Sequence, residues 1–408
     1  MKKQKTEKKY RNAGFLAEPL RLLPDWYEKN GRDLPWRRTK DPYDVWISEI
    51  MCQQTRISAV KEYYRRFREE LPDVRSLAVV DDDRLMKLWE GLGYYSRARN
   101  LKRAARIIME KYGGVIPTDP KRLEKLPGIG SYTAGAVASI AGHVPVPSVD
   151  GNVLRICSRL AGNDDDVMLP ATKKALESAL SDIMADLCVS SGANGASIPP
   201  GKRSGLQGSG QNACSVDPGV LNQAMMELGE MICLPNGAPL CGDCPVRECC
   251  CAGNCGAEEI LPFRSRPKKR RVEKRTVLLI QNGETVLIRK RPEKGLLAGL
   301  WEFPSAEGFL DEKSALGLVR EIIPDGSPVP LRIEKLGPAK HIFSHVEWRM
   351  RAYRIRLADP CPDAVTAWNR DGMKFVGAAE LSGIYSMPAA FEVYRKEIQE
   401  SLSSGRAG

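Results

Sequence analysis

The sequence predicts a multidomain protein in which an all-helical domain over residues 15–256 precedes an α+β domain over residues 275–402. Three observations support this division. Apolar residues recur at helical spacing over residues 20–187, seven cysteines crowd into residues 233–255, and short β-rich runs begin with the second domain. A chain of 408 residues is too long for one ordinary hydrophobic core, so each domain is expected to bury its own.

The helical region has short connections, because brief segments rich in Gly, Pro or Asp, such as GRDLPW, YGGVIPTDP and HVPVPSVDG, separate its periodic stretches. Residues 189–219 have the Gly, Ser and Pro content of a flexible insertion that cannot bury a core. Helical periodicity resumes in LNQAMMELGEMIC and leads into the cysteines. The cysteine cluster is therefore expected to close the helical domain.

The charge balance favours a polyanionic partner. Sixty-two Lys and Arg against 51 Asp and Glu give a formal charge of +11, which suits nucleic acid, although a merely soluble basic protein remains the alternative. Residues 257–274 contain most of the basic run FRSRPKKRRVEKR and are predicted to be an interdomain linker, with DNA contact as a second reading. The absence of a long apolar run predicts no membrane association and a cytoplasmic location, nucleoid-associated if prokaryotic.

The cysteines are spaced like metal ligands. The pattern C-x7-C-x2-C-x5-C is formed by Cys233, Cys241, Cys244 and Cys250, and four thiolates suit either an iron-sulfur cluster or a structural zinc. Disulfides are a weaker reading because the N-terminus, MKKQKTEKKYRN, lacks the apolar core that secretion requires, and free structural thiols are a further alternative. Cys249 and Cys251 flank the fourth position and leave its identity open.

A glycine-containing hairpin is predicted in KLPGIGSYTAGAVASIAG, residues 125–142. Gly128 and Gly130 permit positive φ and a close approach, and the following helix start offers unpaired N–H groups to a phosphate. An ordinary turn between helices would use glycines as well. Further along, Asp150 precedes the amphipathic pattern GNVLRICSRL. It is a good helix N-cap, and a carboxylate held there could also face a sugar of bound DNA.

These segments together resemble the helix-hairpin-helix DNA glycosylases, in which a hairpin and a downstream Asp precede a four-cysteine iron-sulfur loop, and the match covers nearly all of residues 20–255. WISEIMCQQT at 46–55, GLGYYSRARNL at 91–101 and VDGNVLR at 149–155 are similar to the adenine DNA glycosylase (MutY) branch. That branch removes adenine mispaired with 8-oxoguanine.

The resemblance implies a [4Fe-4S] cluster in the loop 233–250, held by the four spaced cysteines. It also implies a monomer that binds double-stranded DNA containing A:8-oxoguanine or A:G mispairs. The sequence departs from the family in two places. The first cysteine spacing is seven residues where six are usual, and the insertion at 189–219 is absent from the usual pattern.

Two carboxylates are predicted to divide the chemistry. Trp46, Ile47, Ile50 and Met51 surround Glu49, which favours a partly buried carboxyl with a raised pKa over a solvent-facing helical Glu. Such a group can protonate a ring nitrogen of adenine, which otherwise leaves poorly. Positive charge then accumulates on the sugar, and the carboxylate of Asp150 would stabilise it.

Tyr132 is informative because related lyases carry a Lys at the matching place in the hairpin's second helix, and that Lys forms a Schiff base with the sugar. The Tyr predicts base excision without efficient strand cleavage. By resemblance, Tyr132 and Asn152 line the catalytic pocket; a core aromatic and a helix-start residue are the alternatives.

A glycosylase extrudes its base and fills the gap with side chains that wedge into the stack. Gln54 and Tyr94 match the family's wedge positions, and Gln53 and Arg32 lie in matching contact segments. Without the resemblance, Tyr94 would be read as a core residue.

The second domain resembles the Nudix-like C-terminal domain of adenine glycosylases, with GLLAGLWEFP at 295–304 and HIFSHVEWR at 341–349. A Nudix hydrolase holds its metal with several carboxylates of one helix. The matching segment here reads REIIPD, residues 320–325, and lacks part of that set. The domain is therefore expected to recognise its ligand rather than hydrolyse it. The resemblance implies that Phe343, Ser344 and His345 contact 8-oxoguanine; otherwise they are ordinary residues at the start of a strand.

The predicted function is therefore monofunctional hydrolysis of the N-glycosidic bond of adenine mispaired with 8-oxoguanine or guanine. A thymine or uracil mismatch glycosylase is the enzymatic alternative, which the second domain disfavours. A non-catalytic lesion-binding protein is the other, which Glu49 and Asp150 disfavour.

Overall fold

The computed structural model describes residues 14–188, 216–265, 269–322, 331–357 and 372–403. They form two compact units, each assembled from separate parts of the chain. The first contains residues 1–64, 73–75 and 103–266, and the second combines residues 65–72 and 76–102 with residues 267–408. The C-terminal part of the second unit therefore begins at residue 267, inside the predicted linker 257–274. The unit also includes residues 65–72 and 76–102, which the sequence predicts to lie in the helical domain.

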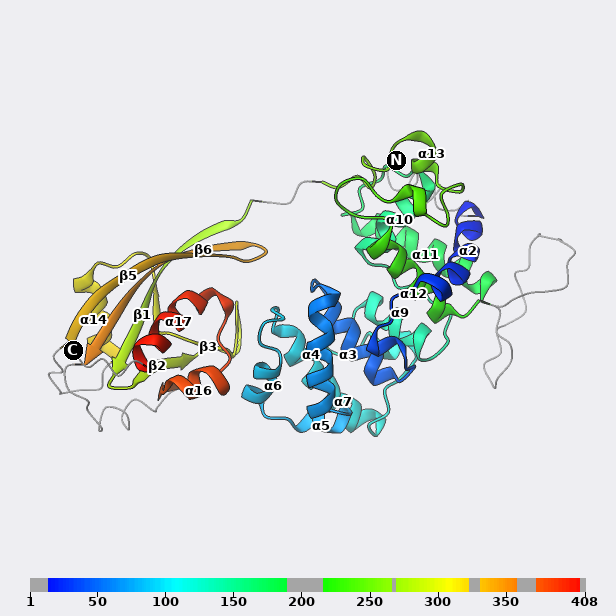
Figure 1. Ribbon diagram of the computed structural model, residues 1–408. Helices are drawn as coiled ribbons and strands as arrows, with labels where there is room; N and C mark the ends of the chain where they lie inside the picture. The colour runs from blue at the N-terminus through cyan, green and yellow to red at the C-terminus, as the bar shows by residue number, and fades with distance from the viewer. Residues whose placement is uncertain (1–13, 189–215, 266–268, 323–330, 358–371, 404–408) are drawn as a thin grey trace, which may run out of the picture. The chain divides into compact units, whose positions relative to one another are not determined.

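The first unit is all-helical, as predicted (Figure 1). Its elements are α2 (Gly14–Asn30), η1 (Pro35–Arg37), α3 (Pro42–Cys52), most of α4 (Ile57–Glu70) and of α7 (Ser96–Tyr112), α8 (Pro120–Leu123), α9 (Ser131–Ile140), α10 (Gly151–Ala161), α11 (Pro170–Leu187), α12 (Pro218–Met231), η2 (Cys241–Asp243) and α13 (Cys251–Cys255). Leucines and other apolar residues of α2, α10, α11 and α12 form a buried cluster in this unit. No helix in the described part of the chain has the length and apolarity to cross a membrane.

Asp-Pro pairs set the start of three helices in this unit. Asp41, Asp119 and Asp217 each accept backbone N–H groups of the first turn, and each is followed by a Pro at the first helical position. The last of these pairs begins α12 at Pro218. The final residues of the predicted insertion 189–219 therefore belong to a helix, and residues 189–215 lie outside the described part of the chain.

The second unit is α+β, as predicted. Its strands are β1 (Arg271–Asn282), β2 (Thr285–Lys290), β3 (Trp301–Glu302), β4 (Ser305–Glu307), β5 (Leu331–Ile342), β6 (Val346–Leu357) and β7 (Met373–Val376). Its helices are most of α5 (Val74–Val79), the remaining parts of α4 and α7, α6 (Asp82–Leu88), α14 (Glu312–Ile322), α16 (Ala378–Gly383), η3 (Ala389–Phe391) and α17 (Glu392–Ser403). The strand order is β3-β2-β1-β6-β5, with β1 and β6 parallel.

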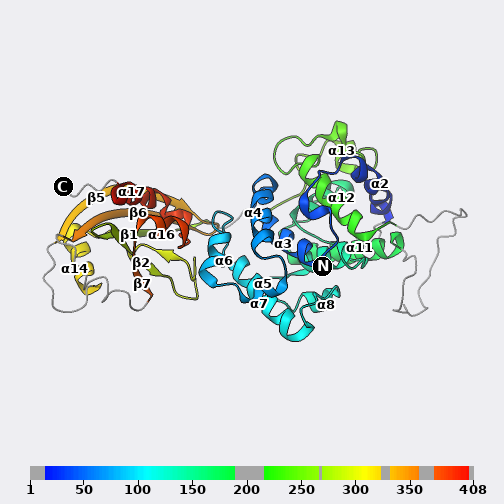
Figure 2. The same cartoon turned by 60° about the horizontal axis from the view of Figure 1, so that its bottom comes forward.

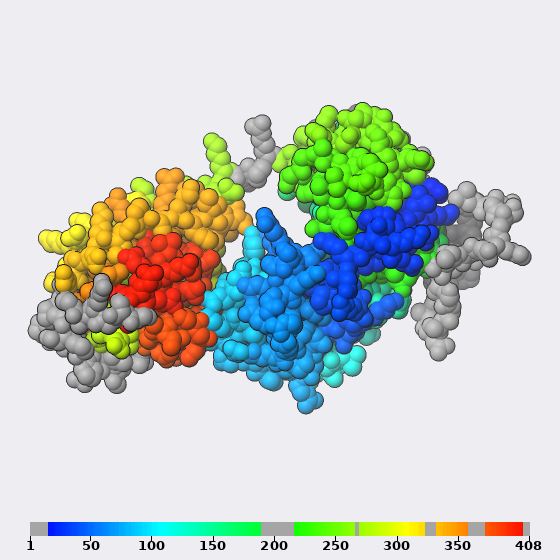
Figure 3. Space-filling model, in the orientation of Figure 1, coloured from blue at the N-terminus to red at the C-terminus, as the bar shows by residue number. Residues whose placement is uncertain are grey.

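Two helices cover opposite faces of this sheet. Apolar residues of α17 pack with one set of alternating strand residues, and those of α14 pack with the other set. Figure 2 shows the sheet between the two helices, and in Figure 3 the α16 and α17 region forms a continuous surface over one face. Since β1 begins at Arg271, the last four residues of the predicted linker lie in the sheet.

The β-rich run HIFSHVEWRMRAYRIRL is not a single strand but part of a hairpin. It begins in the last residues of β5, turns at residues 343–345 and continues as β6, and the Phe343 N–H donates to the Val346 carbonyl at 2.8 Å. The predicted Nudix segment 320–325 ends α14 at Ile322, and its remainder lies outside the described residues.

Candidate active site

A cavity of about 640 Å³ in the first unit brings together most of the predicted site residues. Its walls come from η1, α3, the turn after α3, α9, α10 and α12. The predicted residues that line it are Arg32, Glu49, Gln53, Gln54, Tyr132, Asp150 and Asn152. A space of this size is typical of pockets for small ligands and can hold an extruded nucleobase.

Glu49 is buried on α3, as its apolar neighbours predict. Only 9% of the residue is exposed. The pKa of Glu49 is raised to about 7, chiefly by burial and in smaller part by the charge of Asp150, against the hydrogen bond from Tyr132 and the charge of Arg37, which lower it. A carboxyl with this pKa holds a proton near neutral pH and can donate it.

Asp150 is the N-cap of α10, which confirms that part of the prediction. Its Oδ1 accepts the backbone N–H groups of Asn152 at 2.8 Å and Val153 at 2.9 Å. Burial raises the pKa of Asp150 above its ordinary value, and these two hydrogen bonds offset only part of that rise. The cap therefore fixes the Asp150 carboxylate on the cavity wall. No lysine is among the described residues that line this cavity.

Tyr132 is the second residue of α9, and its hydroxyl forms the hydrogen bond to Glu49. The same hydroxyl lies 3.8 Å from the sulfur of Met226. Burial raises the pKa of Tyr132 well above its ordinary value, so the phenol stays neutral. Asn152 donates to Glu230 at 3.2 Å.

A buried ion cluster beside the cavity was not predicted. Arg32 donates to Glu227 through its backbone N–H at 3.0 Å and Nε at 2.6 Å, and Arg37 Nη2 donates to it at 2.6 Å. Burial alone would raise the pKa of Glu227, but the hydrogen bonds from the two arginines outweigh it and lower the pKa to about 2. The Arg32 guanidinium is therefore held against the wall, with one third of its side chain exposed.

The turn after α3 exposes one of the predicted wedge residues. Gln54 is exposed and has a φ of 56°, a left-handed conformation that costs a non-glycine residue about 1–2 kcal/mol. Its neighbour Gln53 is fixed by donating its side-chain amide to Thr133 Oγ1 at 3.3 Å. Strain of this kind is concentrated at functional sites.

In the second unit, Tyr94, the other predicted wedge residue, lies next to the loop 343–345, which is predicted to contact the lesion. Tyr94 has a φ of 46° and is 49% exposed, so it is not a core residue. Its hydroxyl lies 2.6 Å from that of Ser344. Ser344 and His345 are exposed in the β5–β6 turn, whereas the Phe343 ring packs 4.9 Å from that of Trp348.

The predicted hairpin lies between α8 and α9. Gly128 has a φ of 80°, as expected, but Gly130 has extended backbone with a φ of −97°, so the expectation of positive φ is wrong there. Gly130 is instead the N-cap of α9, where no side chain caps the helix and a Cβ would meet nothing within 4 Å. Both properties suit a close approach by a phosphate.

Four cysteines share a second cavity. Cys233, Cys241, Cys244 and Cys250, the predicted ligands, all line it. Arg159 donates to the sulfur of Cys233 at 3.2 Å. Cys249, Cys251 and Cys255 are not among the lining residues, and no disulfide involves any of the seven. Within the described ranges, no three His, Cys, Asp or Glu side chains are arranged to hold a single metal ion.

Comparisons with known proteins identify the family of this chain. The model of the HhH-GPD superfamily of base excision DNA repair proteins matches residues 47–185, and a NUDIX domain model matches residues 276–396. The adenine DNA glycosylase of Rattus norvegicus is 32% identical, covering 85% of this chain and 72% of its own, and that of Schizosaccharomyces pombe is 30% identical, covering 94% and 91%. A solved thermostable thymine-DNA glycosylase overlaps 61% of this chain and 98% of its own at 24% identity, with a TM-score of 0.46. The chain belongs to the adenine DNA glycosylase family.

Proposed function

We propose that the protein is a monofunctional DNA glycosylase that hydrolyses the N-glycosidic bond of adenine mispaired with 8-oxoguanine or guanine, acting as a monomer on double-stranded DNA. The observation that carries the proposal is the presence of a buried carboxyl, Glu49, and a partly buried one, Asp150, on the wall of one cavity. The different environments of these carboxyls suit them to different parts of one reaction.

Glu49 is the general acid of this mechanism. Its proton moves to a ring nitrogen of the extruded adenine, which leaves as a neutral base when the bond from C1′ breaks. Asp150 stabilises the positive charge that develops on C1′ and the ring oxygen, since its carboxylate is fixed by the α10 cap. The Glu49 carboxylate then accepts a proton from the water that attacks C1′, which restores the acid.

The cavity also explains why strand cleavage is not expected. A lyase needs an amine to form a Schiff base with C1′. Tyr132 occupies the position beside Glu49, and the described residues that line the cavity include no lysine.

The test is a panel of duplexes containing A opposite 8-oxoguanine, A opposite G, T opposite G and U opposite G. The protein should release only adenine, and the product strand should break only after alkali treatment. Light scattering should give a mass near 45.2 kDa for the free protein. Preferential release of thymine or uracil would reject the proposal in favour of a mismatch glycosylase, and binding without release would favour a lesion-binding protein.

The β5–β6 turn is proposed to contact 8-oxoguanine, because it exposes two polar side chains next to Tyr94. Replacing both Ser344 and His345 with Ala should reduce the preference for A:8-oxoguanine over A:G by about tenfold, the cost of one or two hydrogen bonds. Single-turnover rates on the two mispairs measure the ratio, and the A:G rate is the internal control. An unchanged ratio would contradict the assignment.

The four cysteines of the second cavity are proposed to hold a [4Fe-4S] cluster. Thiolates around one zinc ion lie roughly 3.8 Å apart, given Zn–S bonds of about 2.3 Å, whereas a four-iron cluster spreads its thiolates more widely. Four cysteines line this cavity and no histidine is among its described lining residues, which fits the all-thiolate ligation of such a cluster. When bound, the cluster would hold the loop 233–250 folded against α10, and no step of excision passes through it.

Serine variants distinguish the fourth ligand. Cys250→Ser should lose the visible absorption of the cluster and about one quarter or more of the bound iron, because it removes a thiolate that lines the cavity. Cys249→Ser and Cys251→Ser are matched neighbours, and both should retain the wild-type spectrum. Loss of the spectrum in Cys249→Ser with retention in Cys250→Ser would reverse the assignment.

A further inference from the structure

One face of the long strands carries four cations near the β5–β6 turn. Strand residues alternate between faces, and the face packed on α14 includes Lys274 of β1, Lys340 of β5, and Arg349 and Arg351 of β6. All four are exposed. We call these four residues the basic face.

Three of the four cations stand side by side. Lys340 pairs directly with Arg349, and Arg349 pairs directly with Lys274 on the next strand. Neighbouring strands lie about 4.8 Å apart, so the row places three positive charges within roughly 10 Å. Like charges directly opposite each other destabilise a sheet. Glu347 offsets one of them, because it accepts from Arg349 Nε at 2.9 Å.

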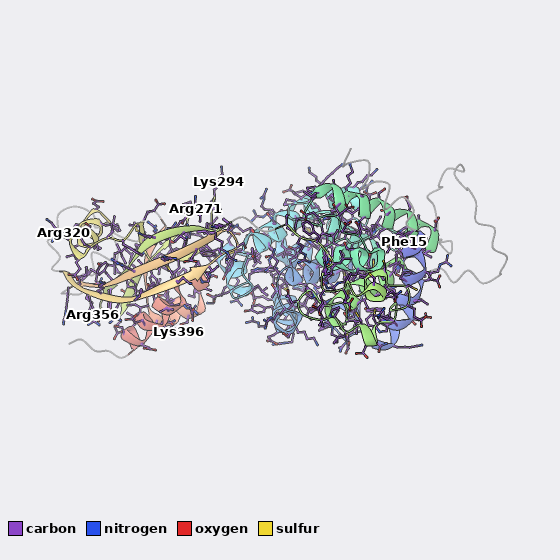
Figure 4. The ribbon with its side chains drawn as sticks, turned by 90° about the horizontal axis from the view of Figure 1, so that it is seen from above. Phe15, Arg271, Lys294, Arg320, Arg356 and Lys396 are labelled. Carbon is purple, nitrogen blue, oxygen red and sulfur yellow. The ribbon has the colours of Figure 1, made fainter. Side chains whose placement is uncertain are left out.

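Among the described residues, α14 covers only the end of this face that lies away from the turn. The residues that pack with α14 lie farther along the strands, among them Leu278, Ile280 and Ile355. Figure 4 shows Arg271, which pairs with the first residue of β6, and Arg356 toward opposite ends of the long strands. Toward the Arg271 end, the described helices leave the basic face exposed to solvent.

We propose that the basic face binds phosphates of the DNA strand that carries 8-oxoguanine. The inference rests on the proposed function, because that function places the damaged base at the turn 343–345. Lys340 and Arg349 lie three and four residues from the turn, roughly 10–14 Å along the strands. A DNA strand presents a phosphate about every 3.4 Å of helix axis, so the row lies at the level of phosphates roughly three to four nucleotides from the damaged base. These contacts fix the strand without reading its sequence.

The test compares two double variants of equal charge. Lys274→Gln with Lys340→Gln removes two cations of the basic face. Lys313→Gln with Lys396→Gln removes two exposed lysines of α14 and α17, and Figure 4 shows Lys396 on α17. Fluorescence anisotropy at several KCl concentrations gives the affinity for a duplex with 2′-fluoro-2′-deoxyadenosine opposite 8-oxoguanine, which resists excision because fluorine disfavours positive charge on the sugar.

The basic-face variant should bind about tenfold to hundredfold more weakly at 0.1 M salt, and the slope of log Kd against log salt should fall by about 2, since each lost phosphate contact removes about 0.9. The control variant should retain the wild-type slope. Equal slopes in both variants, or a loss confined to the 8-oxoguanine duplex and absent from undamaged DNA, would overturn the proposal.

The two proposals fail in different ways. Single-turnover excision at saturating protein should be unchanged in the basic-face variant, because neither lysine lines the active-site cavity. If the wild-type protein releases no adenine from any duplex, the proposed function fails. The salt slopes would still decide whether these lysines bind phosphates.

Discussion

Glu49→Gln is expected to reduce adenine excision by about 10⁴-fold while leaving affinity for the mispair nearly unchanged. General acid–base catalysis contributes about 10²–10⁴-fold, and the upper end applies because the same carboxyl serves two proton transfers. Gln preserves the size of the side chain and can still accept the Tyr132 hydrogen bond. Single-turnover rates and anisotropy with the uncleavable duplex measure the two quantities. Wild-type turnover in this variant would refute the assignment.

The same change should stabilise the protein at high pH. The pKa of Glu49 is about 7 in the folded protein against 4.5 for an exposed Glu, a difference of 2.5. Between these values the folded state keeps a proton that the unfolded state releases, so stability falls as pH rises, by about 3 kcal/mol in total. Gln does not titrate and escapes this loss.

Thermal unfolding at two pH values tests that expectation. Glu49→Gln should melt several degrees above the wild type at pH 8 and at the same temperature near pH 4.5. The exposed Glu69→Gln is a control of the same chemistry outside the cavity. Equal melting temperatures of Glu49→Gln and wild type at pH 8 would show that Glu49 is not held protonated by burial. Wild-type kcat/KM should fall above pH 7, as the proton is lost.

The sequence predicts the burial of Glu49 because the evidence for it is local. WISEIM places apolar residues on every side of Glu49, so burial follows from the neighbouring positions alone. The partners of this acid cannot be read in the same way. Arg37 and Glu227 lie 190 residues apart, and only the packing of η1 against α12 joins them at the cavity. The direction of the Glu49 pKa shift could be predicted from the sequence. The balance between burial, the Tyr132 hydrogen bond and the charges of Arg37 and Asp150 depends on the fold.

The β5–β6 hairpin could not be predicted from the sequence, for a different reason. No Gly, Pro, Asn or Asp marks the turn at residues 343–345, so the apolar pattern of HIFSHVEWR reads as continuous. The early part of β5 carries alternating charges and an irregular register between Leu336 and Ala339, which hides its strand pattern. The pairing of β5 with β6 shows where one strand ends and the next begins. Residues 343–345 are therefore the turn of a hairpin rather than the start of a strand.

Asp150→Asn should reduce excision by about 10²–10³-fold without unfolding α10. Asn caps helices as well as Asp does, so the hydrogen bonds from Asn152 and Val153 can persist. What disappears is the negative charge beside the developing oxocarbenium ion, and removing one preorganised electrostatic contact typically costs about this factor. Single-turnover excision at saturating protein measures the loss.

A second N-cap provides the control for Asp150. Asp217 caps α12 in the same way, with Oδ1 accepting the N–H groups of Gly219 at 2.7 Å and Val220 at 3.1 Å, and it does not line the cavity. Asp217→Asn should keep the wild-type excision rate. If both variants lost activity equally, the effect of Asp150 would lie in helix capping. If only Asp150→Asn lost activity while melting like the wild type, its charge would be what the reaction needs, because both substitutions retain an N-cap oxygen. The charge that Asp217→Asn removes lies outside the cavity, where it pairs with Lys40 and His143.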